Sequence, residues 1–252
     1  MTRRHRPDDD VVVAGRRPVR EALRAGRVSA LFVDRSFLRA EPLRRLAEEA
    51  ERHRIPVRHL DAHDLDRLAQ GPPHQGVVAR VRLPAELGEA DLAGREWPGS
   101  ALALVLDGVT DPQNLGAAAR GAEAAGASVL VSRRHRGAAV SAAAVRASAG
   151  ALLHLPMARV ANIGRAIQRL QEAGFWSIGL DADAPRRIDE LDPPDGRLAV
   201  VAGAEGPGLS RLVRERCDEL ASIPMLGRVD SLNVAVASAL ALYVLGPMAR
   251  KN

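Results

Sequence analysis

The strongest constraint on the fold is a regular alternation of apolar runs and helical segments after residue 100. Residues 101–108, ALALVLDG, have the composition of a buried strand, and residues 114–126 have that of a helix ending at Gly126. Similar pairs continue to residue 246. Because the strands are apolar throughout rather than alternately polar, both of their faces are expected to be covered. The sequence therefore predicts an α/β fold with a parallel sheet between layers of helices.

The same reading assigns each element of this second unit. Strands are expected at 101–108, 128–132, 155–160, 175–181, 197–203 and 220–225, and helices at 114–126, 141–153, 162–174, 209–218 and 231–246. Asn162 is expected to cap the helix that follows it. Asp230 or Ser231 is expected to cap the last, strongly apolar helix.

A smaller α/β unit precedes this one. A short strand or turn is expected at 11–15, strands at 29–34, 55–60 and 76–82, and helices at 16–26, 42–54 and 61–71. Asp61 is expected to cap the third of these helices. Residues 84–99, rich in glycine, proline and acids, are expected to be a linker. The predicted division is a flexible tail at 1–10, a first domain at 11–83, the linker, and a second domain at 100–248.

The basic residues are concentrated in the first third of the chain. Of the 36 basic residues 35 are arginine, and the one lysine is Lys251. Residues 1–84 contain 18 arginines and 12 acids, a net charge of +6, whereas residues 85–252 have a net charge of −1. This asymmetry indicates an acidic partner for the first unit. The preference for arginine over lysine has two open explanations: phosphate recognition, or a GC-rich genome or hot habitat.

Composition excludes several classes of protein. No apolar run approaches the roughly 20 residues of a membrane span. The polar start, MTRRHRPDDD, lacks the apolar core of a signal peptide, so a cytoplasmic location is expected. The single cysteine, Cys217, excludes an internal disulfide and a cysteine-based zinc site, and we expect no metal. Aromatic residues make up 2%, too few for base-stacking platforms.

Three segments at predicted strand ends carry glycines and polar side chains, namely 106–120, 200–210 and 222–240. In open parallel sheets, ligands bind beyond the carboxyl ends of the strands. Each segment alone has a simpler explanation in turn formation or helix capping. Asn233 is harder to explain this way, because it is a poor helix former within an apolar helix. Arg120 follows Asn114 by six residues, and we expect the two side chains at nearly the same helix azimuth.

Together the three segments are far more specific. In order and spacing they resemble the three motifs of the SpoU/TrmH family of RNA ribose 2′-O-methyltransferases, in the SPOUT superfamily. The similarity covers about residues 100–248 and includes RASAGALLHLP at 146–156. The first unit resembles the N-terminal substrate-binding domain of the RlmB-like branch, in VAGRRPVREAL and HQGVVARV.

The resemblance implies both a fold and an activity. The second unit would be a SPOUT domain with a deep trefoil knot, and the first a ribosomal-protein-like RNA-binding domain. The chain would be a homodimer that uses S-adenosylmethionine to methylate a ribose 2′-hydroxyl in RNA, with no metal and no membrane partner. The RlmB-like first domain points to a guanosine of large-subunit (23S) ribosomal RNA. Transfer RNA, and a resistance-type modification of ribosomal RNA, stay as alternatives.

The resemblance also implies roles for individual residues. The implied catalytic set is Asn114, Arg120, Glu205, Ser231 and Asn233. The implied cofactor set is Gly203, Ile223 and Leu232, whose backbone holds a bent S-adenosylmethionine, with Met225 and Leu226 in the same loop. The third motif reads SLNVAVA where relatives often have SLNVSVA, so Ala235 lacks a hydroxyl.

The chemistry leaves the role of Arg120 open. Methyl transfer to a 2′-oxygen needs an in-line arrangement and removal of the hydroxyl proton. The three motifs contain no histidine, and the family proposal makes the arginine a base. A guanidinium pKa above about 12 makes that costly. Holding a phosphate or the developing alkoxide is the easier role, while Glu205 would orient Arg120 or accept the proton.

Two other classes of protein are less consistent with the sequence. A nucleotide-dependent dehydrogenase needs G-x-G-x-x-G after its first strand, where this chain has VTDPQNLG. An inactive RNA-binding or assembly protein need not retain the polar motif residues, and all of them are present.

Overall fold

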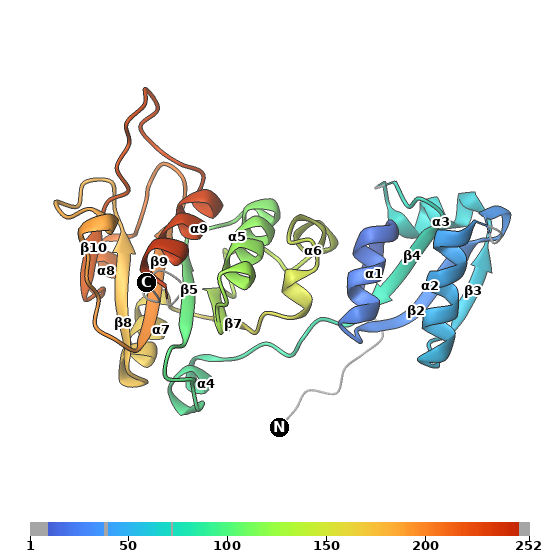
Figure 1. Ribbon diagram of the computed structural model, residues 1–252, viewed down its shortest axis with the longest axis horizontal. Helices are drawn as coiled ribbons and strands as arrows, with labels where there is room; N and C mark the ends of the chain where they lie inside the picture. The colour runs from blue at the N-terminus through green and yellow to red at the C-terminus, as the bar shows by residue number, and fades with distance from the viewer. Residues whose placement is uncertain (1–9, 38–39, 72, 247–252) are drawn as a thin grey trace.

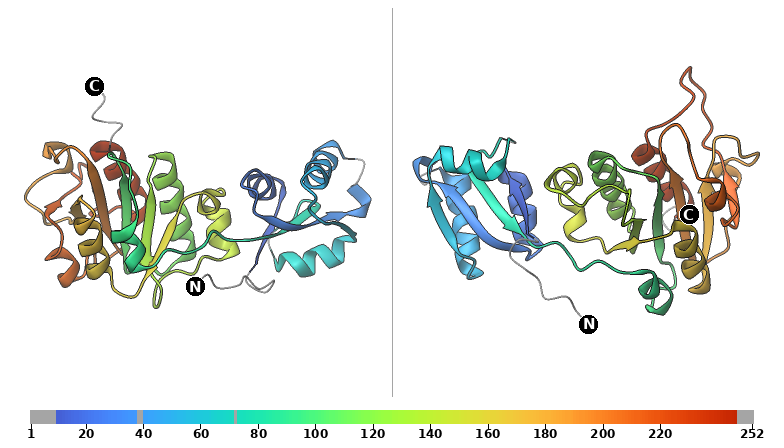
Figure 2. Two further views of the ribbon diagram at one scale, coloured as in Figure 1. Left: turned by 90° about the horizontal axis from the view of Figure 1, so that it is seen from below. Right: turned by 180° about the vertical axis from the view of Figure 1, so that it is seen from behind.

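The computed structural model describes residues 10–37, 40–71 and 73–246. Within them the chain forms two α/β units, drawn in blue to cyan and in green to red (Figure 1, Figure 2). The α/β class predicted from the sequence, with its parallel sheet, is confirmed. The tail predicted at 1–10 lies outside the described residues except for Asp10, as do the last two residues of the predicted second domain, 247–248.

The first unit is a four-stranded mixed sheet with helices on both faces. Its elements are β1 (Val11–Ala14), α1 (Arg16–Arg24), β2 (Val28–Asp34), η2 (Arg35–Phe37), α2 (Glu41–Arg52), β3 (Val57–Leu60), α3 (Ala62–Ala69) and β4 (Val77–Val81). The strand order is β1-β4-β2-β3, with β2 and β3 parallel and the other pairs antiparallel. Helices α1 and α2 cover one face, and α3 covers the other. Asp61 caps α3, as predicted, by accepting a hydrogen bond from the Asp64 amide at 2.9 Å.

The second unit is a six-stranded parallel sheet. Its elements are α4 (Glu89–Gly94), β5 (Leu102–Asp107), α5 (Pro112–Ala124), β6 (Val129–Arg133), α6 (Ala142–Ala147), η3 (Ala151–Leu153), β7 (Met157–Val160), α7 (Ile163–Glu172), β8 (Phe175–Leu180), η4 (Ile188–Glu190), β9 (Arg197–Gly203), α8 (Arg211–Arg214), β10 (Glu219–Ala221) and α9 (Val234–Leu245). The strand order is β10-β8-β9-β5-β6-β7, and each neighbouring pair is parallel.

Two apolar layers enclose this sheet. Alternate residues of a strand point to opposite faces, so Leu104 of β5 packs in the layer of α5 and α9, and Val105 packs in the layer of α4 and α7. Small residues bring α5 close to its neighbours. A Cβ atom on Gly116 would lie 2.4 Å from the Ala144 carbonyl oxygen of the α6 segment. The small residues of α5 thus allow α5 and α6 to pack closely together.

Several predicted elements are shorter than expected, and three of them differ in a way that matters for the fold. The helix predicted at 141–153 divides into α6 and η3, because Ala149 and Gly150 take positive φ values of 50° and 92°. Such values end a right-handed helix. Only Arg211–Arg214 of the predicted 209–218 helix is helical, and β10 ends at Ala221 rather than at residue 225.

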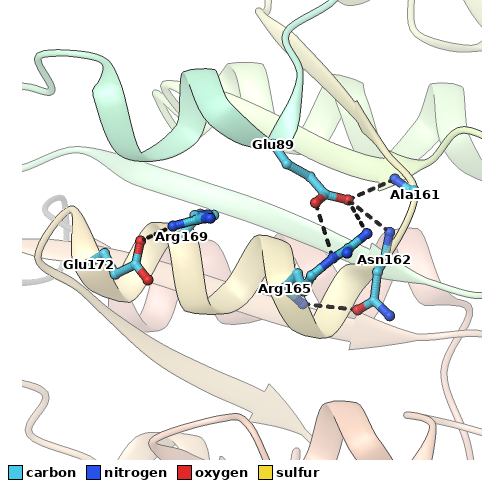
Figure 3. A network of polar contacts seen from close by, with 6 residues as sticks. All are labelled: Glu89, Ala161, Asn162, Arg165, Arg169 and Glu172. Carbon is cyan, nitrogen blue, oxygen red and sulfur yellow. Dashed lines mark hydrogen bonds and ion pairs between the residues drawn. The ribbon is translucent and has the colours of Figure 1, made fainter.

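The segment expected to be a linker, 84–99, contains the helix α4 and belongs to the second unit. Leu92 and Trp97 are buried in the layer beside α7. Figure 3 shows the Glu89 carboxylate of α4 at the start of α7. It accepts hydrogen bonds from the amides of Ala161 at 3.0 Å and Asn162 at 3.1 Å, and pairs with Arg165 at 3.2 Å. These contacts hold α4 against α7 of the second unit.

The two units share apolar contacts. Val145 of α6 and Leu153 of η3 lie in the same buried cluster as Val19 of α1 and the strands of the first sheet. A Cβ atom on Gly150 would lie 2.8 Å from the Glu21 side chain of α1. The helix α6 therefore faces α1 across the boundary between the units (Figure 1, Figure 2).

Candidate functional site

The three polar segments identified in the sequence meet at the carboxyl edge of the parallel sheet. β5 and β9 are neighbours, with Asp107 opposite Gly203 at their ends. The first segment continues into α5, the second leads to α8, and the third connects β10 to α9. Because the strands are parallel, these loops leave the sheet on the same side, where ligands bind in such folds.

Glu205 connects the first and third segments. Its Oε1 accepts hydrogen bonds from Asn233 Nδ2 at 2.5 Å, from Asn114 Nδ2 at 3.4 Å and from the Val234 amide at 3.4 Å. Asn233 Nδ2 also donates to Asn114 Oδ1 at 2.9 Å. Three of the five expected catalytic residues, Asn114, Glu205 and Asn233, are thus brought into one network.

Asn233 forms the N-cap of the last helix. Its Oδ1 accepts a hydrogen bond from the Ala235 amide at 2.9 Å, and α9 begins at Val234. The cap expected at Asp230 or Ser231 is therefore wrong, as is the position of Asn233 inside the helix. The amide oxygen caps the backbone while the amide nitrogen faces Glu205, so one side chain serves both helix and network.

Arg120 lies away from this network. It is exposed on α5, and among the described residues no hydrogen bond or ion pair joins it to another side chain. The shared azimuth expected for Asn114 and Arg120 is wrong. Six residues at about 100° each fall about 120° short of two full turns. Arg120 therefore leaves a different face of α5, with its guanidinium free for a group from outside this chain.

A cavity beside the network collects most of the expected cofactor residues. It is lined by Gly203, Ile223, Met225, Leu232 and the fourth expected catalytic residue, Ser231, with Glu205 at its edge. Gly203 has no room for a side chain, since a Cβ atom there would lie 2.1 Å from the Gly208 carbonyl carbon. The folded 203–208 turn therefore presents backbone to the cavity. Leu226 does not line it and is 97% exposed.

Asp107 fixes the second segment, a role that was not predicted from the sequence. The Asp107 carboxylate is buried, and accepts hydrogen bonds from the Ser210 amide at 2.9 Å and from Arg133 Nη2 at 3.0 Å. It thus holds the loop that carries Gly203 and Glu205. An acidic residue at the end of an otherwise apolar strand was the available signal.

Asp181 is a second residue that the sequence analysis missed. It directly follows β8 and lines the cavity. Its Oδ2 pairs with Arg214 Nε at 2.8 Å, and this ion pair joins the end of β8 to α8. Asp230, on the third segment, lines the same cavity. The signal here was again an acid at the end of an apolar strand.

The single cysteine of the chain, Cys217, is partly buried near two carboxylates. Burial, and then the nearby carboxylates of Asp218 and Asp107, raise the pKa of the Cys217 thiol to about 12, so the thiolate is scarce at neutral pH. The described ranges hold no cluster of three or more metal-ligating side chains of the His, Cys, Asp or Glu type. No helix within them is both long and apolar enough to span a membrane.

Comparison with known proteins decides the family. A model described as the SpoU rRNA methylase family matches residues 101–243. The chain belongs to this family. A second model, described as RNA 2′-O ribose methyltransferase substrate binding, matches residues 12–87. The SpoU chain is therefore an S-adenosylmethionine-dependent RNA 2′-O-methyltransferase, and the resemblance seen in the sequence is confirmed.

Individual relatives agree with this assignment. The 23S rRNA (guanosine-2′-O-)-methyltransferase RlmB of Vibrio parahaemolyticus is 43% identical over 193 residues, which cover 75% of this chain and 76% of that protein. A protein of Mycolicibacterium vanbaalenii named as an uncharacterized tRNA/rRNA methyltransferase is 40% identical over 99% of this chain and 79% of its own length. The crystal structure of the SpoU methyltransferase AviRb from Streptomyces viridochromogenes, in complex with AdoMet, has a TM-score of 0.77 at 29% identity, covering 94% of this chain and 89% of that one.

Proposed function

We propose that this SpoU enzyme methylates the ribose 2′-hydroxyl of a guanosine in 23S ribosomal RNA. The observation that carries the proposal is the Asn114–Glu205–Asn233 network at the carboxyl edge of the sheet, beside a cavity suited to the methyl donor. The choice of RNA and nucleotide is supported by the relative from Vibrio parahaemolyticus, which bears that activity in its name.

The cavity fits S-adenosylmethionine by its lining. Gly203, Ile223, Met225 and Leu232 offer an apolar wall and exposed backbone groups, the features that adenine and ribose need in a pocket. When bound, the cofactor supplies a methyl group already activated on a positively charged sulfur. Ser231 and Glu205 line the same cavity and can receive its polar groups. Leu226 does not line the cavity, and its expected contact with the cofactor stays a prediction.

The protein residues would orient the substrate oxygen and stabilise charge. Arg120, with no partner among the described residues, would hold a phosphate of the RNA or the developing alkoxide. Asn114 and Asn233 hold the Glu205 carboxylate in place, and that carboxylate would position the ribose hydroxyl or accept its proton. This division needs no neutral form of the Arg120 guanidinium.

The first unit would bind the RNA substrate. Its match to the substrate-binding family model and the net charge of +6 on residues 1–84 support this role. The proposed domains are 11–83 for RNA binding and 100–248 for catalysis, with α4 joined to the catalytic domain. We place the activity in the cytoplasm, where ribosomal RNA is modified. The trefoil knot implied by the family stays a prediction.

We further propose that the enzyme is a homodimer through α9. This helix contains no charged residue, although its outer face is exposed. Val236, Leu240, Tyr243 and Val244 are partly exposed and recur at helical spacing, which forms one apolar stripe opposite the buried face. A second copy of the chain is the partner that would cover this stripe.

Incorporation of tritiated methyl groups tests the proposed activity. Purified protein is incubated with labelled S-adenosylmethionine and either a 23S ribosomal RNA transcript or a pool of transfer RNA transcripts. The proposal predicts label in the 23S transcript only. The label should lie in alkali-stable dinucleotides, because a 2′-O-methyl group prevents hydrolysis of the adjacent phosphodiester. Label in transfer RNA alone would contradict the proposed ribosomal RNA substrate and identify transfer RNA as the substrate.

A further inference from the structure

Four arginines from both units line one groove at the domain boundary. Arg16, Arg17 and Arg20 lie on α1, and Arg146 lies on α6. The groove has a volume of about 690 Å³, which is in the range of ligand-binding clefts. Pro18, Pro42, Pro73 and Gln75 complete its walls, and it is separate from the cavity at the sheet edge.

The fold itself holds these guanidinium groups together. Residues three and four apart share a helix face, so Arg16 and Arg20 point the same way from α1, with Arg17 beside them. Arg146 is brought to them because its neighbour Val145 is buried in the core of the first unit. Their proximity is therefore a consequence of the domain contact.

These charges lack acidic partners. Among the described residues, none of the four guanidinium groups forms an ion pair with a carboxylate. Glu21, which also lines part of the groove, is paired with Arg24 at 3.0 Å. Four like charges gathered in one groove repel each other, at a cost that falls when an anion enters. The arrangement thus favours a ligand with several negative charges.

We propose that this groove binds the sugar–phosphate backbone of the RNA substrate and that its phosphates bridge the two units. This inference rests on RNA being the substrate. Arginine forks bind phosphate oxygens in pairs, and no aromatic side chain lines the groove for base stacking. The groove therefore contributes affinity and positions the RNA relative to the catalytic unit, but it does not recognise the base sequence.

The salt dependence of binding tests this inference in the full-length protein. Affinity for a 23S ribosomal RNA transcript is measured by filter binding at several salt concentrations for the wild type and for Arg17→Ala, Arg20→Ala and Arg146→Ala. Each substitution is expected to weaken binding and to reduce the slope of log K against log salt by about 1. Arg146→Lys, which keeps the charge, is expected to retain most of the slope.

Arg58→Ala is the matched control for the two α1 substitutions. Arg58 is an exposed arginine on β3 of the first unit, and it lies outside the groove. It is expected to leave the slope unchanged. An equal reduction in Arg58→Ala, or an unchanged slope in Arg146→Ala, would overturn the bridging groove. Methyl transfer by the wild type is measured in parallel. If the wild type binds RNA through the groove without methylating it, the proposed function fails while this inference stands.

Discussion

Single residues at the site combine two structural tasks. Asn233 caps α9 with its amide oxygen and donates to Glu205 and Asn114 with its amide nitrogen. The residue types and their order were readable from the sequence, since they match the family motifs. The pairing itself joins positions 119 residues apart, which no local pattern encodes. The azimuth of Arg120 was misjudged from simple helix geometry.

Alanine substitution of two capping asparagines separates these tasks. Asn162 caps α7 as Asn233 caps α9. The Asn162 oxygen accepts a hydrogen bond from the amide three residues on, and the Asn233 oxygen from the amide two residues on, each at 2.9 Å. Asn162→Ala and Asn233→Ala are each expected to lower the free energy of unfolding by about 0.5–2 kcal/mol. Only Asn233→Ala is expected to lose methyl transfer. Urea denaturation and turnover assays measure both effects, and equal turnover in the two variants would remove Asn233 from the site.

Arg120→Ala is expected to lower turnover by about 10²–10³-fold, because it removes the charge proposed to stabilise the reacting oxygen. Binding of S-adenosylmethionine, measured by calorimetry, should be nearly unchanged. Glu123→Ala is the control, being an exposed residue of the same helix outside the network. Wild-type turnover in Arg120→Ala would show that the active site has been assigned wrongly.

At the scale of elements, alternating apolar runs predicted most strands and helices, and the glycine-rich segment before β5 was misread. Helix α4 has only six residues, too few to show a periodic pattern, and glycines lie at both ends. Its stability comes from tertiary contacts of Leu92 and Glu89. A linker and a short docked helix therefore have similar sequences, and only packing distinguishes them.

Glu89→Ala measures how strongly α4 is docked. The Glu89 carboxylate accepts hydrogen bonds from two backbone amides at the start of α7 and is mostly shielded from solvent. Its loss is therefore expected to lower the free energy of unfolding by about 1–3 kcal/mol. Glu172→Ala removes an exposed ion pair with Arg169 on the same helix and is expected to cost less than about 0.5 kcal/mol. Equal denaturation midpoints for Glu89→Ala and Glu172→Ala would mean that Glu89 does not hold α4 in place.

At the scale of the whole molecule, charge and apolar surface are distributed over different parts. The first unit carries the net positive charge and three of the four groove arginines, whereas α9 presents an uncharged apolar stripe. The net charge predicted an acidic partner but not the groove, since Arg146 is 126 positions from Arg20 along the chain. Likewise the apolar last helix was visible in the sequence, whereas its exposed side required the fold.

Leu240→Glu tests the role of α9 in assembly. Leu240 is 43% exposed in the middle of the stripe, and a buried charge there is expected to disrupt a dimer. Sedimentation at micromolar concentration should show a dimer for the wild type and a monomer for the variant. Leu212→Glu, an exposed apolar position on α8, is expected to leave the dimer intact. A monomeric wild type would contradict the proposed interface.

The central claim is methylation of a guanosine ribose in 23S ribosomal RNA, and mapping 2′-O-methyl groups in cellular RNA tests it most directly. Total RNA is compared from cells that have the protein, cells that lack it, and cells that carry Arg120→Ala. We predict one 23S guanosine whose 2′-O-methyl mark is present with the wild type and absent from the other two. An unchanged map of 23S RNA, or a mark lost from transfer RNA instead, would contradict the account.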